Sequence, residues 1–292
     1  MSHRRPREVL PMFAPNEYQL LDFGEGRKLE RFGAVVLDRP APAATGPIQD
    51  SERWAAATAR YERTTGNRGA WRAVVAASQL PVGWSVRHGG TVLELKLTPF
   101  GHLGVFPEQA ANWDWIAERV AAAGRGIRVL NLFAYTGAST LAAAGAGAEV
   151  VHVDAARNIL AWARRNAELS GLGGAPVRWI CEDAVTFVRR ELKRGNPYHA
   201  VILDPPSYGH GAKGDVWKLA EHLPSLLADC ARLTASNRSF VLLSCHTPGF
   251  GPEALAAMLA DAFDGDDMES AEMRVTALSG RVLVSGAMAR SR

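Results

Sequence analysis

The chain has 292 residues, of which 47% are hydrophobic and 22% charged, and its formal net charge is +3. This composition is typical of globular proteins and excludes a largely disordered chain, and the length predicts about two domains. No run approaches the ~18 consecutive apolar residues of a membrane-spanning helix. No apolar segment follows the basic N-terminus, so we expect neither a membrane anchor nor a secretion signal. Three cysteines without a Cys-x-x-Cys pair predict a reduced, cytoplasmic protein.

The basic and acidic residues are distributed unevenly. Residues 1–100 hold 14 basic and 10 acidic side chains, a formal charge of +4, and the remaining residues hold 19 and 20, a charge of −1. An excess of positive charge can contact phosphates, although an ordinary solvated surface carries such an excess as well. The charge alone therefore does not identify a partner.

Residues 1–100 predict a small, strand-rich α+β domain at the N-terminus. Short apolar runs over 18–38, interrupted by glycines, predict antiparallel strands with tight turns. A helix is predicted from Ser51, because Trp54, Ala57 and Tyr61 follow at spacings of three and four and would share one face. The alternation of apolar and polar residues over 91–98 predicts a further strand with one solvated face.

Residues 101–292 predict a second, larger domain in which strands alternate with helices, as in a parallel sheet with crossover helices. The predicted strands cover 127–133, 149–153, 177–180, 199–203, 240–244, 268–276 and 282–288. The predicted helices cover 139–146, 157–170, 185–192, 216–233 and 253–263. We expect Pro224 to kink or split the helix over 216–233, and we expect the last two strands to form a hairpin at the sheet edge.

Several conspicuous residues are expected to have structural roles. Trp113 and Trp115 begin a helix, and we expect them to pack between the two domains rather than stack on bases. Cys181 and Cys230 fall on a predicted strand and a predicted helix, and we expect both in the core. The histidines lack metal-ligand spacing such as H-x-x-x-H, so the sequence predicts no catalytic metal.

Two motifs follow the first two strands of the larger domain, where ligands of open α/β sheets bind. The first is Asn131-Leu-Phe-Ala-Tyr-Thr-Gly137, a turn that lets the backbone approach a ligand before a helix N-terminus able to bind a carboxylate. The alternative is a tight turn without a ligand. The second motif is Asp154, about 20 residues later, which is placed to accept hydrogen bonds from ribose hydroxyls. The alternative for Asp154 is a helix cap.

Two further motifs follow the third and fourth strands. Asp183 comes after the third strand, where an acid can accept a hydrogen bond from the amino group of adenine. Asp204-Pro205-Pro206-Ser207-Tyr208 follows the fourth strand. The two prolines lack N–H donors and fix φ, so the Asp204 carboxylate and the carbonyls form a rigid row of acceptors for a flat base or an amine. The turn at Gly137 together with Asp154 suits an adenosyl cofactor, either a nicotinamide dinucleotide or S-adenosylmethionine, and a dehydrogenase has no evident need of the Asp204-Pro205-Pro206 segment.

The order of these motifs resembles the class I S-adenosylmethionine-dependent methyltransferases. More closely, it resembles the large-subunit ribosomal RNA methyltransferases of the cytosine-C5 type, on His102-Leu-Gly-Val-Phe-Pro-Glu-Gln109 and Leu130-Asn-Leu-Phe-Ala-Tyr-Thr-Gly137. The resemblance covers about residues 100–290. It implies a Rossmann-like α/β fold with a mostly parallel seven-stranded sheet and helices on both faces, S-adenosylmethionine as cofactor and RNA, above all ribosomal RNA, as substrate. The RNA-binding PUA domain of many relatives is not evident.

The resemblance also implies roles for individual residues. Tyr135, Thr136 and Gly137 would line the methionine end of the cofactor, together with Asn131 and Phe133. Asp154 would hold the ribose, Asp183 and Ala184 would face the adenine, and Phe106 and Gln109 would close over the cofactor. Asp204, which would also contact the cofactor, would line the place where the target meets the methyl group, together with Pro205, Pro206 and Tyr208.

The acceptor atom stays open between two routes. Cys245, just after the fifth strand, resembles the nucleophile of RNA cytosine-C5 methyltransferases, and its alternative reading is a small buried residue. His246 beside it is an unsuitable partner for the thiol, because adjacent strand residues point to opposite faces. The second route methylates a nitrogen held by Asp204 and the Pro-Pro carbonyls. Tyr208 follows one position later than the aromatic residue of the amino-methylating pattern.

Other functions are compatible with a similar sheet. A nicotinamide-dependent oxidoreductase requires a G-x-G-x-x-G fingerprint at the first turn, which residues 131–139 lack. A non-catalytic RNA-binding module has no need of the motifs at Gly137, Asp154, Asp183 and Asp204. A methyltransferase that acts on a protein or a small molecule remains an alternative, because the loops that select the substrate have no recognisable pattern.

Overall fold

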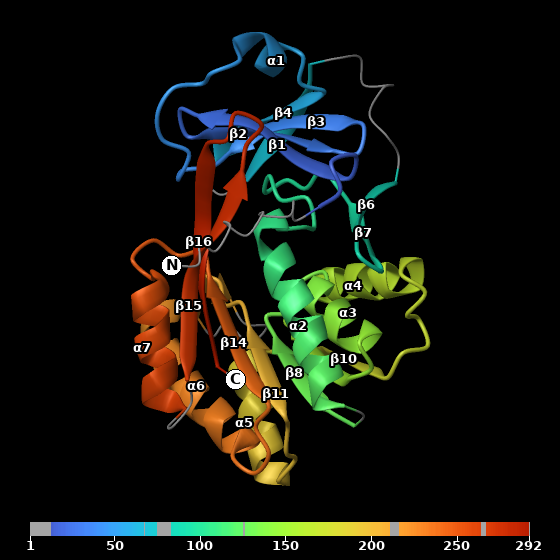
Figure 1. Ribbon diagram of the computed structural model, residues 1–292, viewed down its shortest axis with the longest axis vertical. Helices are drawn as coiled ribbons and strands as arrows, with labels where there is room; N and C mark the ends of the chain where they lie inside the picture. The colour runs from blue at the N-terminus through green and yellow to red at the C-terminus, as the bar shows by residue number, and fades with distance from the viewer. Residues whose placement is uncertain are drawn as a thin grey trace, which may run out of the picture.

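The computed structural model describes residues 13–66, 68–74, 83–124, 126–210, 216–263 and 267–291. Figure 1 shows a small sheet of N-terminal residues above a larger α/β body, with a long C-terminal hairpin that reaches from the body to the small sheet. Within the described ranges, no helix has the length and apolar character needed to cross a membrane.

The small sheet contains five strands in chain order. They are β1 (Tyr18–Gly24), β2 (Arg27–Phe32), β3 (Val35–Pro40), β4 (Ala59–Thr65) and β5 (Arg68–Ala73). β3 and β4 are parallel and the other neighbours antiparallel, and a parallel pair requires a crossover connection. The short helix α1 (Ser51–Ala55) lies in this crossover.

The prediction of a helix from Ser51 to Tyr61 is therefore wrong beyond the first five residues. The helix ends at Ala55, and Tyr61 lies in β4, opposite Trp71 of β5. Strand pairing on both sides of β4 and the hydrogen bond from the Tyr61 hydroxyl to the Pro99 carbonyl (2.8 Å) fix this segment as a strand. Such contacts override the local helical pattern.

The hairpin of β6 (Trp84–His88) and β7 (Thr91–Leu95) packs on the larger body although it precedes residue 100. The backbone N–H of Glu94 donates to the Asn166 side chain (2.8 Å), and the Trp162 indole donates to the Glu94 carbonyl (3.1 Å). The buried Trp113 packs against Phe13 and His88 of the N-terminal part, which is the packing role expected for it. The same expectation is wrong for Trp115, which lies in the core of the larger body against Phe240, with ring centroids 5.3 Å apart.

The larger body contains a seven-stranded sheet in the order β10-β9-β8-β11-β14-β16-β15. β16 is antiparallel to both neighbours, and the other pairs are parallel. The expected mostly parallel seven-stranded sheet is confirmed. Its strands are β8 (Arg128–Leu132), β9 (Glu149–Asp154), β10 (Val177–Cys181), β11 (Ala200–Leu203), β14 (Phe240–Cys245), β15 (Met268–Thr276) and β16 (Val282–Ser291).

Helices cover both faces of this sheet. The segments are η2 (Pro107–Gln109), α2 (Ala110–Ala123), α3 (Ala138–Gly145), α4 (Arg157–Leu169), α5 (Ala184–Arg194), α6 (Leu219–Thr234) and α7 (Pro252–Ala262). Side chains of α5, α6 and α7 share one buried cluster with Leu130 and Leu132 of β8. Side chains of α2 and α3 share another with Val129 of β8, because successive strand residues point to opposite faces.

Two expectations about α6 and the cysteines need correction. Residues Val216–Lys218 form β13, which pairs with β12 (Tyr208–His210), and α6 begins at Leu219. Pro224 lies within one continuous helix, on its exposed side, and does not split it. Cys230 is buried as expected, but Cys181 is exposed, because it ends β10, the edge strand of the sheet.

Candidate active site

The site lies where the strand order reverses. From β8 the chain continues to β9 and β10 on one side of the sheet, and β11 and β14 lie on the other. At the carboxyl ends of these strands the structure holds a cavity of about 490 Å³. This volume lies in the range of ~300–1,000 Å³ that is usual for small-molecule sites. A narrower cavity of about 40 Å³ adjoins it behind Phe106 and Tyr135.

The structure brings nearly all sequence-predicted site residues to these two cavities. The larger is lined by Phe106, Phe133, Tyr135, Asp154, Asp183, Ala184, Asp204, Pro205 and Pro206. The narrower is lined by Phe106, Gln109, Asn131, Phe133, Tyr135, Thr136, Gly137 and Asp204. Tyr208 and Cys245 line neither.

The turn between β8 and α3 has an unusual backbone. Phe133 and Tyr135 have φ values of 54° and 49°, and Gly137, the N-cap of α3, has a φ of 91°. Left-handed conformations of non-glycine residues are uncommon and need support from their surroundings. The Thr136 hydroxyl supplies part of that support by donating to the Gly104 carbonyl (2.6 Å). The turn thus aims the N-terminus of α3 at the narrower cavity.

Asp154 supports the same turn from β9. Its Oδ2 accepts the backbone N–H of Tyr135 and its Oδ1 that of Ala156, both at 2.9 Å. Burial raises the pKa of the Asp154 carboxyl, and these two N–H donors oppose the rise. Since a carboxylate offers about four lone-pair positions, each oxygen keeps one position for a ligand in the larger cavity.

Other predicted residues serve first as supports. Asp183 is the N-cap of α5 and accepts the backbone N–H of Thr186 (2.8 Å). Asn131 is buried and donates to the Thr140 hydroxyl (2.9 Å). Burial raises the pKa of Tyr135 to about 12, so its phenol stays neutral.

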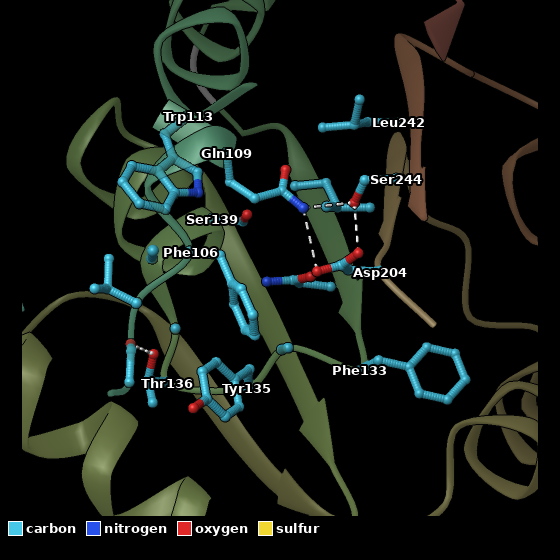
Figure 2. A pocket seen from close by; sticks show the side chains of 17 residues that line it. Phe106, Gln109, Trp113, Phe133, Tyr135, Thr136, Ser139, Asp204, Leu242 and Ser244 are labelled. Atoms are coloured by element: carbon cyan, nitrogen blue, oxygen red, sulfur yellow. Dashed lines mark hydrogen bonds between the residues drawn. The ribbon is translucent and has the colours of Figure 1, made fainter. Parts of the chain in front are cut away.

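Asp204 is fixed by a small network (Figure 2). The Ser244 hydroxyl donates to its Oδ1 (2.8 Å), and the Gln109 amide donates to its Oδ2 (3.2 Å) and to the Ser244 hydroxyl (2.9 Å). The side-chain amide of Asn112 in turn donates to the side-chain oxygen of Gln109, Oε1 (2.7 Å). The Gln109 side chain is therefore used to orient Asp204.

The segment after Asp204 is held from two further elements. The Trp217 indole of β13 donates to the Pro206 carbonyl (2.7 Å), and its ring packs on Phe133 with centroids 5.0 Å apart. The hydroxyls of Ser207 and Thr247 are 2.6 Å apart. Trp217, Ser244 and Asn112 are not among the site residues that the sequence predicts. Alternation along the fifth strand could have separated Ser244 from its core neighbours, but Trp217 carried no signal.

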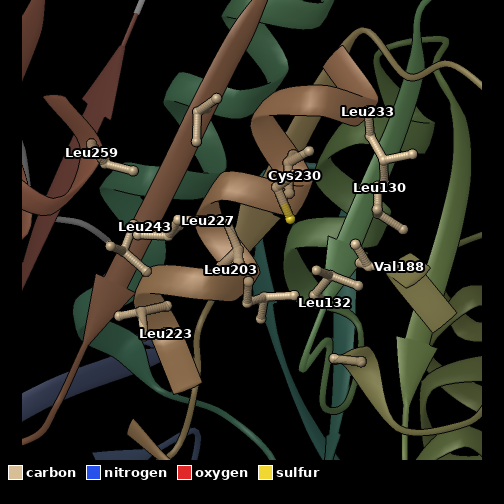
Figure 3. Close-up of a cluster of buried hydrophobic side chains, with 14 of the residues drawn as sticks. Leu130, Leu132, Val188, Leu203, Leu223, Leu227, Cys230, Leu233, Leu243 and Leu259 are labelled. Atoms are coloured by element: carbon tan, nitrogen blue, oxygen red, sulfur yellow. The ribbon is translucent and has the colours of Figure 1, made fainter. Parts of the chain in front are cut away.

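The side chains of Cys245 and Tyr208 are not among those that line the two cavities. Cys245 is 1% exposed and belongs to the hydrophobic cluster between the sheet, α6 and α7, part of which Figure 3 shows. Burial raises the pKa of the Cys245 thiol, which disfavours the reactive thiolate. Tyr208 is 53% exposed on β12. His246, the next residue after Cys245, does line the larger cavity.

Known proteins share both sequence and structure with this chain. Residues 47–260 match the family model described as S-adenosylmethionine-dependent methyltransferase. A SAM-dependent methyltransferase of Agrobacterium tumefaciens, of known crystal structure, is 36% identical and superposes with a TM-score of 0.88 over 94% of this chain and 90% of that one.

Curated relatives match over a shorter stretch. The ribosomal RNA large subunit methyltransferase K/L of Hahella chejuensis is 32% identical over 164 residues, which is 56% of this chain and 22% of that protein. The ribosomal RNA large subunit methyltransferase K of Neisseria meningitidis is 34% identical over 136 residues, 43% of this chain and 38% of that protein. The chain therefore spans less than half of these curated relatives.

Proposed function

Because the chain belongs to the S-adenosylmethionine-dependent methyltransferases, we propose that it methylates a nitrogen of an RNA base, with ribosomal RNA as the substrate. The observation that carries this proposal is the pair of fixed carboxylates, Asp154 at the end of β9 and Asp204 just after β11, which line one cavity. Asp154 is placed to bind the ribose of the cofactor, and Asp204 is placed to bind the amine that accepts the methyl group.

The residues around the cavities fit S-adenosylmethionine. Asp154 keeps free lone pairs for the two ribose hydroxyls. Phe133, Ala155 and Ala184 offer apolar walls for the adenine. The first N–H groups of α3 border the narrower cavity and suit the carboxylate of the methionine end, since a helix N-terminus binds anions. Asp183, which lines the larger cavity, would face the adenine amino group.

When bound, S-adenosylmethionine supplies an electrophilic methyl group on a sulfonium, so the contribution of the protein is orientation. Asp204 is held by Ser244 and Gln109 and can accept a hydrogen bond from the target amine. The Trp217 indole donates a hydrogen bond to the Pro206 carbonyl, and Pro205 lines the larger cavity. Asp204 and Pro205 would orient the nitrogen of a base that has left its stack.

Burial of Cys245 supports nitrogen rather than cytosine C5 as the acceptor. The C5 route requires a thiolate in contact with the base. The Cys245 thiol belongs to the core, and burial raises its pKa.

An exposed aromatic platform beside the cavity supports RNA as the substrate, as do the names of the curated relatives. Phe100 is 51% exposed, two residues from His102 in the cavity wall, and the Arg68 guanidinium lies 5.8 Å from its ring centroid. The Trp71 indole donates to the Thr98 carbonyl (2.8 Å), which helps to fix this loop. Arginine and aromatic side chains together bind unstacked nucleotides, and ribosomal RNA would place the protein in the cytoplasm.

The test is methyl transfer from labelled S-adenosylmethionine to ribosomal RNA that lacks the modification, with mass spectrometry of the nucleosides. We expect a base methylated on nitrogen. A C5-methylated cytosine, or transfer to protein alone, would overturn the proposal. We also expect Phe100→Ala and Arg68→Glu to raise KM for RNA about tenfold, as the loss of one stacked base predicts. Arg232→Glu on α6 is the control.

A further inference from the structure

We propose that His246 is the proton acceptor of the reaction, and that its Nε2 takes the proton that an N–H of the target base loses on methylation. This inference rests on the proposed nitrogen acceptor, and it narrows that acceptor to an amino or imino N–H. A ring nitrogen without a proton needs no such residue.

The hydrogen bonds of His246 define which ring nitrogen is available. His246 follows β14, and its side chain lines the larger cavity beside Asp204 and Thr247. Its Nδ1 lies 2.8 Å from the Ser285 carbonyl oxygen. A carbonyl only accepts hydrogen bonds, so Nδ1 carries the proton of the neutral ring and Nε2 is left with a lone pair. The ring packs on Phe106 with centroids 5.3 Å apart, which fixes its plane.

Two carboxylates flank the imidazole. Its Nε2 lies 3.8 Å from Oδ1 of Asp204, and its Nδ1 lies 3.7 Å from Oε1 of Glu108. Both separations exceed hydrogen-bond length, so Nε2 is not consumed by Asp204 and space remains for a substrate N–H. Glu108 is 5% exposed, and its Oε2 has no hydrogen-bond partner among the described residues. A nearly buried negative charge thus lies beside the ring.

The surrounding charges favour the protonated ring that proton transfer would produce. Desolvation lowers the pKa of His246. The charges of Asp204 and Glu108, together with the hydrogen bond to the Ser285 carbonyl, outweigh desolvation and raise the pKa above its ordinary value, although Lys28 opposes them. His102 is a further titratable group that interacts with His246, because the charge of His246 contributes to lowering the pKa of His102. A raised pKa makes the ring a stronger proton acceptor than an ordinary histidine.

The proposed step balances without a further reagent. The nitrogen lone pair forms the new bond to the methyl carbon as the carbon–sulfur bond breaks, and the electron pair of that bond stays on sulfur. The N–H bond electrons remain on nitrogen, and the proton moves to Nε2. Asp204 is less suited to this role, because both of its oxygens already accept hydrogen bonds and a carboxylate is a weaker base than imidazole.

The experiment combines NMR titration of the full-length protein with single-turnover kinetics. His246→Asn keeps a donor at the position of Nδ1 for the Ser285 carbonyl but has no Nε2. His199→Asn, at the opposite end of the sheet, is the matched control. In the wild type we expect the His246 ring to titrate above the ordinary histidine value of ~6.5, and the rate to fall with the same pKa as pH decreases, because the protonated ring cannot accept a proton.

In His246→Asn we expect a loss of about 100-fold in the single-turnover rate, no such pH dependence and unchanged affinity for S-adenosylmethionine. A variant that retains the rate and its pH dependence would overturn the inference, as would a His246 ring that titrates below the ordinary value. If the product is N-methylated while the variant is fully active, this inference fails alone. If the product is methylated on carbon, the proposed function fails with it.

Discussion

Asp154 holds the β8–α3 turn and faces the larger cavity with the same carboxylate. In Asp154→Ala the ligand would lose a charged hydrogen-bond acceptor worth about 1.5–3 kcal/mol. We expect affinity for S-adenosylmethionine, measured by calorimetry, to fall about 10- to 100-fold. Glu149→Ala, which removes an exposed carboxylate at the other end of the same strand, is the control. Equal affinities in the two variants would contradict the assignment of Asp154 to the ribose.

The pKa of Asp154 gives the same site a pH dependence. Burial raises this pKa, so the carboxylate becomes protonated at a higher pH than the ordinary ~3.9. We therefore expect cofactor affinity to begin to fall, as pH decreases, above the range of ordinary aspartates. Calorimetric titrations at a series of acidic pH values test this, and affinity that is constant down to pH ~4 would contradict it.

Gly104 permits the close packing of the segment before η2 on α4. Its φ is 98°, and a Cβ there would lie 2.2 Å from the Trp162 ring. Gly124 has a φ of 81° and a ψ of −165°, with no atom within 4 Å of a Cβ, so Gly124→Ala measures the backbone cost alone, about 1–3 kcal/mol. We expect Gly104→Ala to lower the free energy of unfolding by about 1–3 kcal/mol more, through overpacking. If chemical denaturation gives the same loss of unfolding free energy for Gly104→Ala and Gly124→Ala, then Trp162 shifts to accommodate the Cβ at no cost.

At the scale of elements, the sequence predicted the large sheet better than the short segments. The strands and helices from β8 to β11 follow long periodic patterns, and their ends carry Asp154, Asp183 and Asp204 as expected. The pattern predicts a helix for Val216–Lys218, because three residues fit either period. Only pairing with Tyr208–His210 shows that the segment is a strand.

The position of Cys245 shows a second limit of the sequence. Alternation groups Cys245 with Val241 and Leu243 and separates it from Ser244. It does not tell which face of β14 borders the cavity, since that depends on α6 and α7 covering the other face. The network of Gln109, Ser244 and Asn112 is likewise a product of tertiary packing.

Helix α6 contains a proline, Pro224, at a position where proline weakens a helix. Pro224 lies at the sixth residue of the helix, is exposed and cannot donate a backbone hydrogen bond. We expect Pro224→Ala to raise the free energy of unfolding by about 2 kcal/mol, because the helical cost of proline, ~3 kcal/mol, exceeds the entropy it removes from the unfolded chain. Pro252 begins α7, where proline is favourable, so Pro252→Ala should give no gain. A loss of stability in Pro224→Ala would mean that a local bend is needed for core packing.

At the scale of the whole molecule, the β15–β16 hairpin joins the two sheets. Its turn lies beside β1, where the backbone N–H of Leu278 donates to the Leu20 carbonyl (3.1 Å). Arg281 of this turn donates to the carbonyls of Phe23 (2.9 Å) and Pro47 (3.1 Å), and its guanidinium lies 4.1 Å from the Phe23 ring centroid. A shared hydrophobic cluster continues this contact. The small sheet is thus attached to the same body that holds the cavity.

Replacing Arg281 tests whether the stability of the large sheet depends on its contacts with the small sheet. Arg281→Ala removes three hydrogen bonds, to the carbonyls of Phe23, Thr45 and Pro47, the ion pair with Asp22 and the stacking on Phe23. We expect it to lower the free energy of unfolding by roughly 2 kcal/mol. Because the lost contacts are all to the small sheet and its β3–β4 connection, hydrogen exchange should increase in β1 to β5 and stay unchanged in β8 and β9, where the cofactor residues lie. Arg274→Ala, on the exposed face of β15 and paired with Glu272, is the control and should change neither.

The same variant separates cofactor binding from RNA binding. The cofactor residues lie on strands of the large sheet, so affinity for S-adenosylmethionine should not change in Arg281→Ala. The Phe100 loop is held by Tyr61 and Trp71 of the small sheet, so a loosened sheet should raise KM for RNA. If affinity for S-adenosylmethionine falls as much as RNA binding, the hairpin supports the cavity itself, and the small sheet is not an independent platform for the substrate.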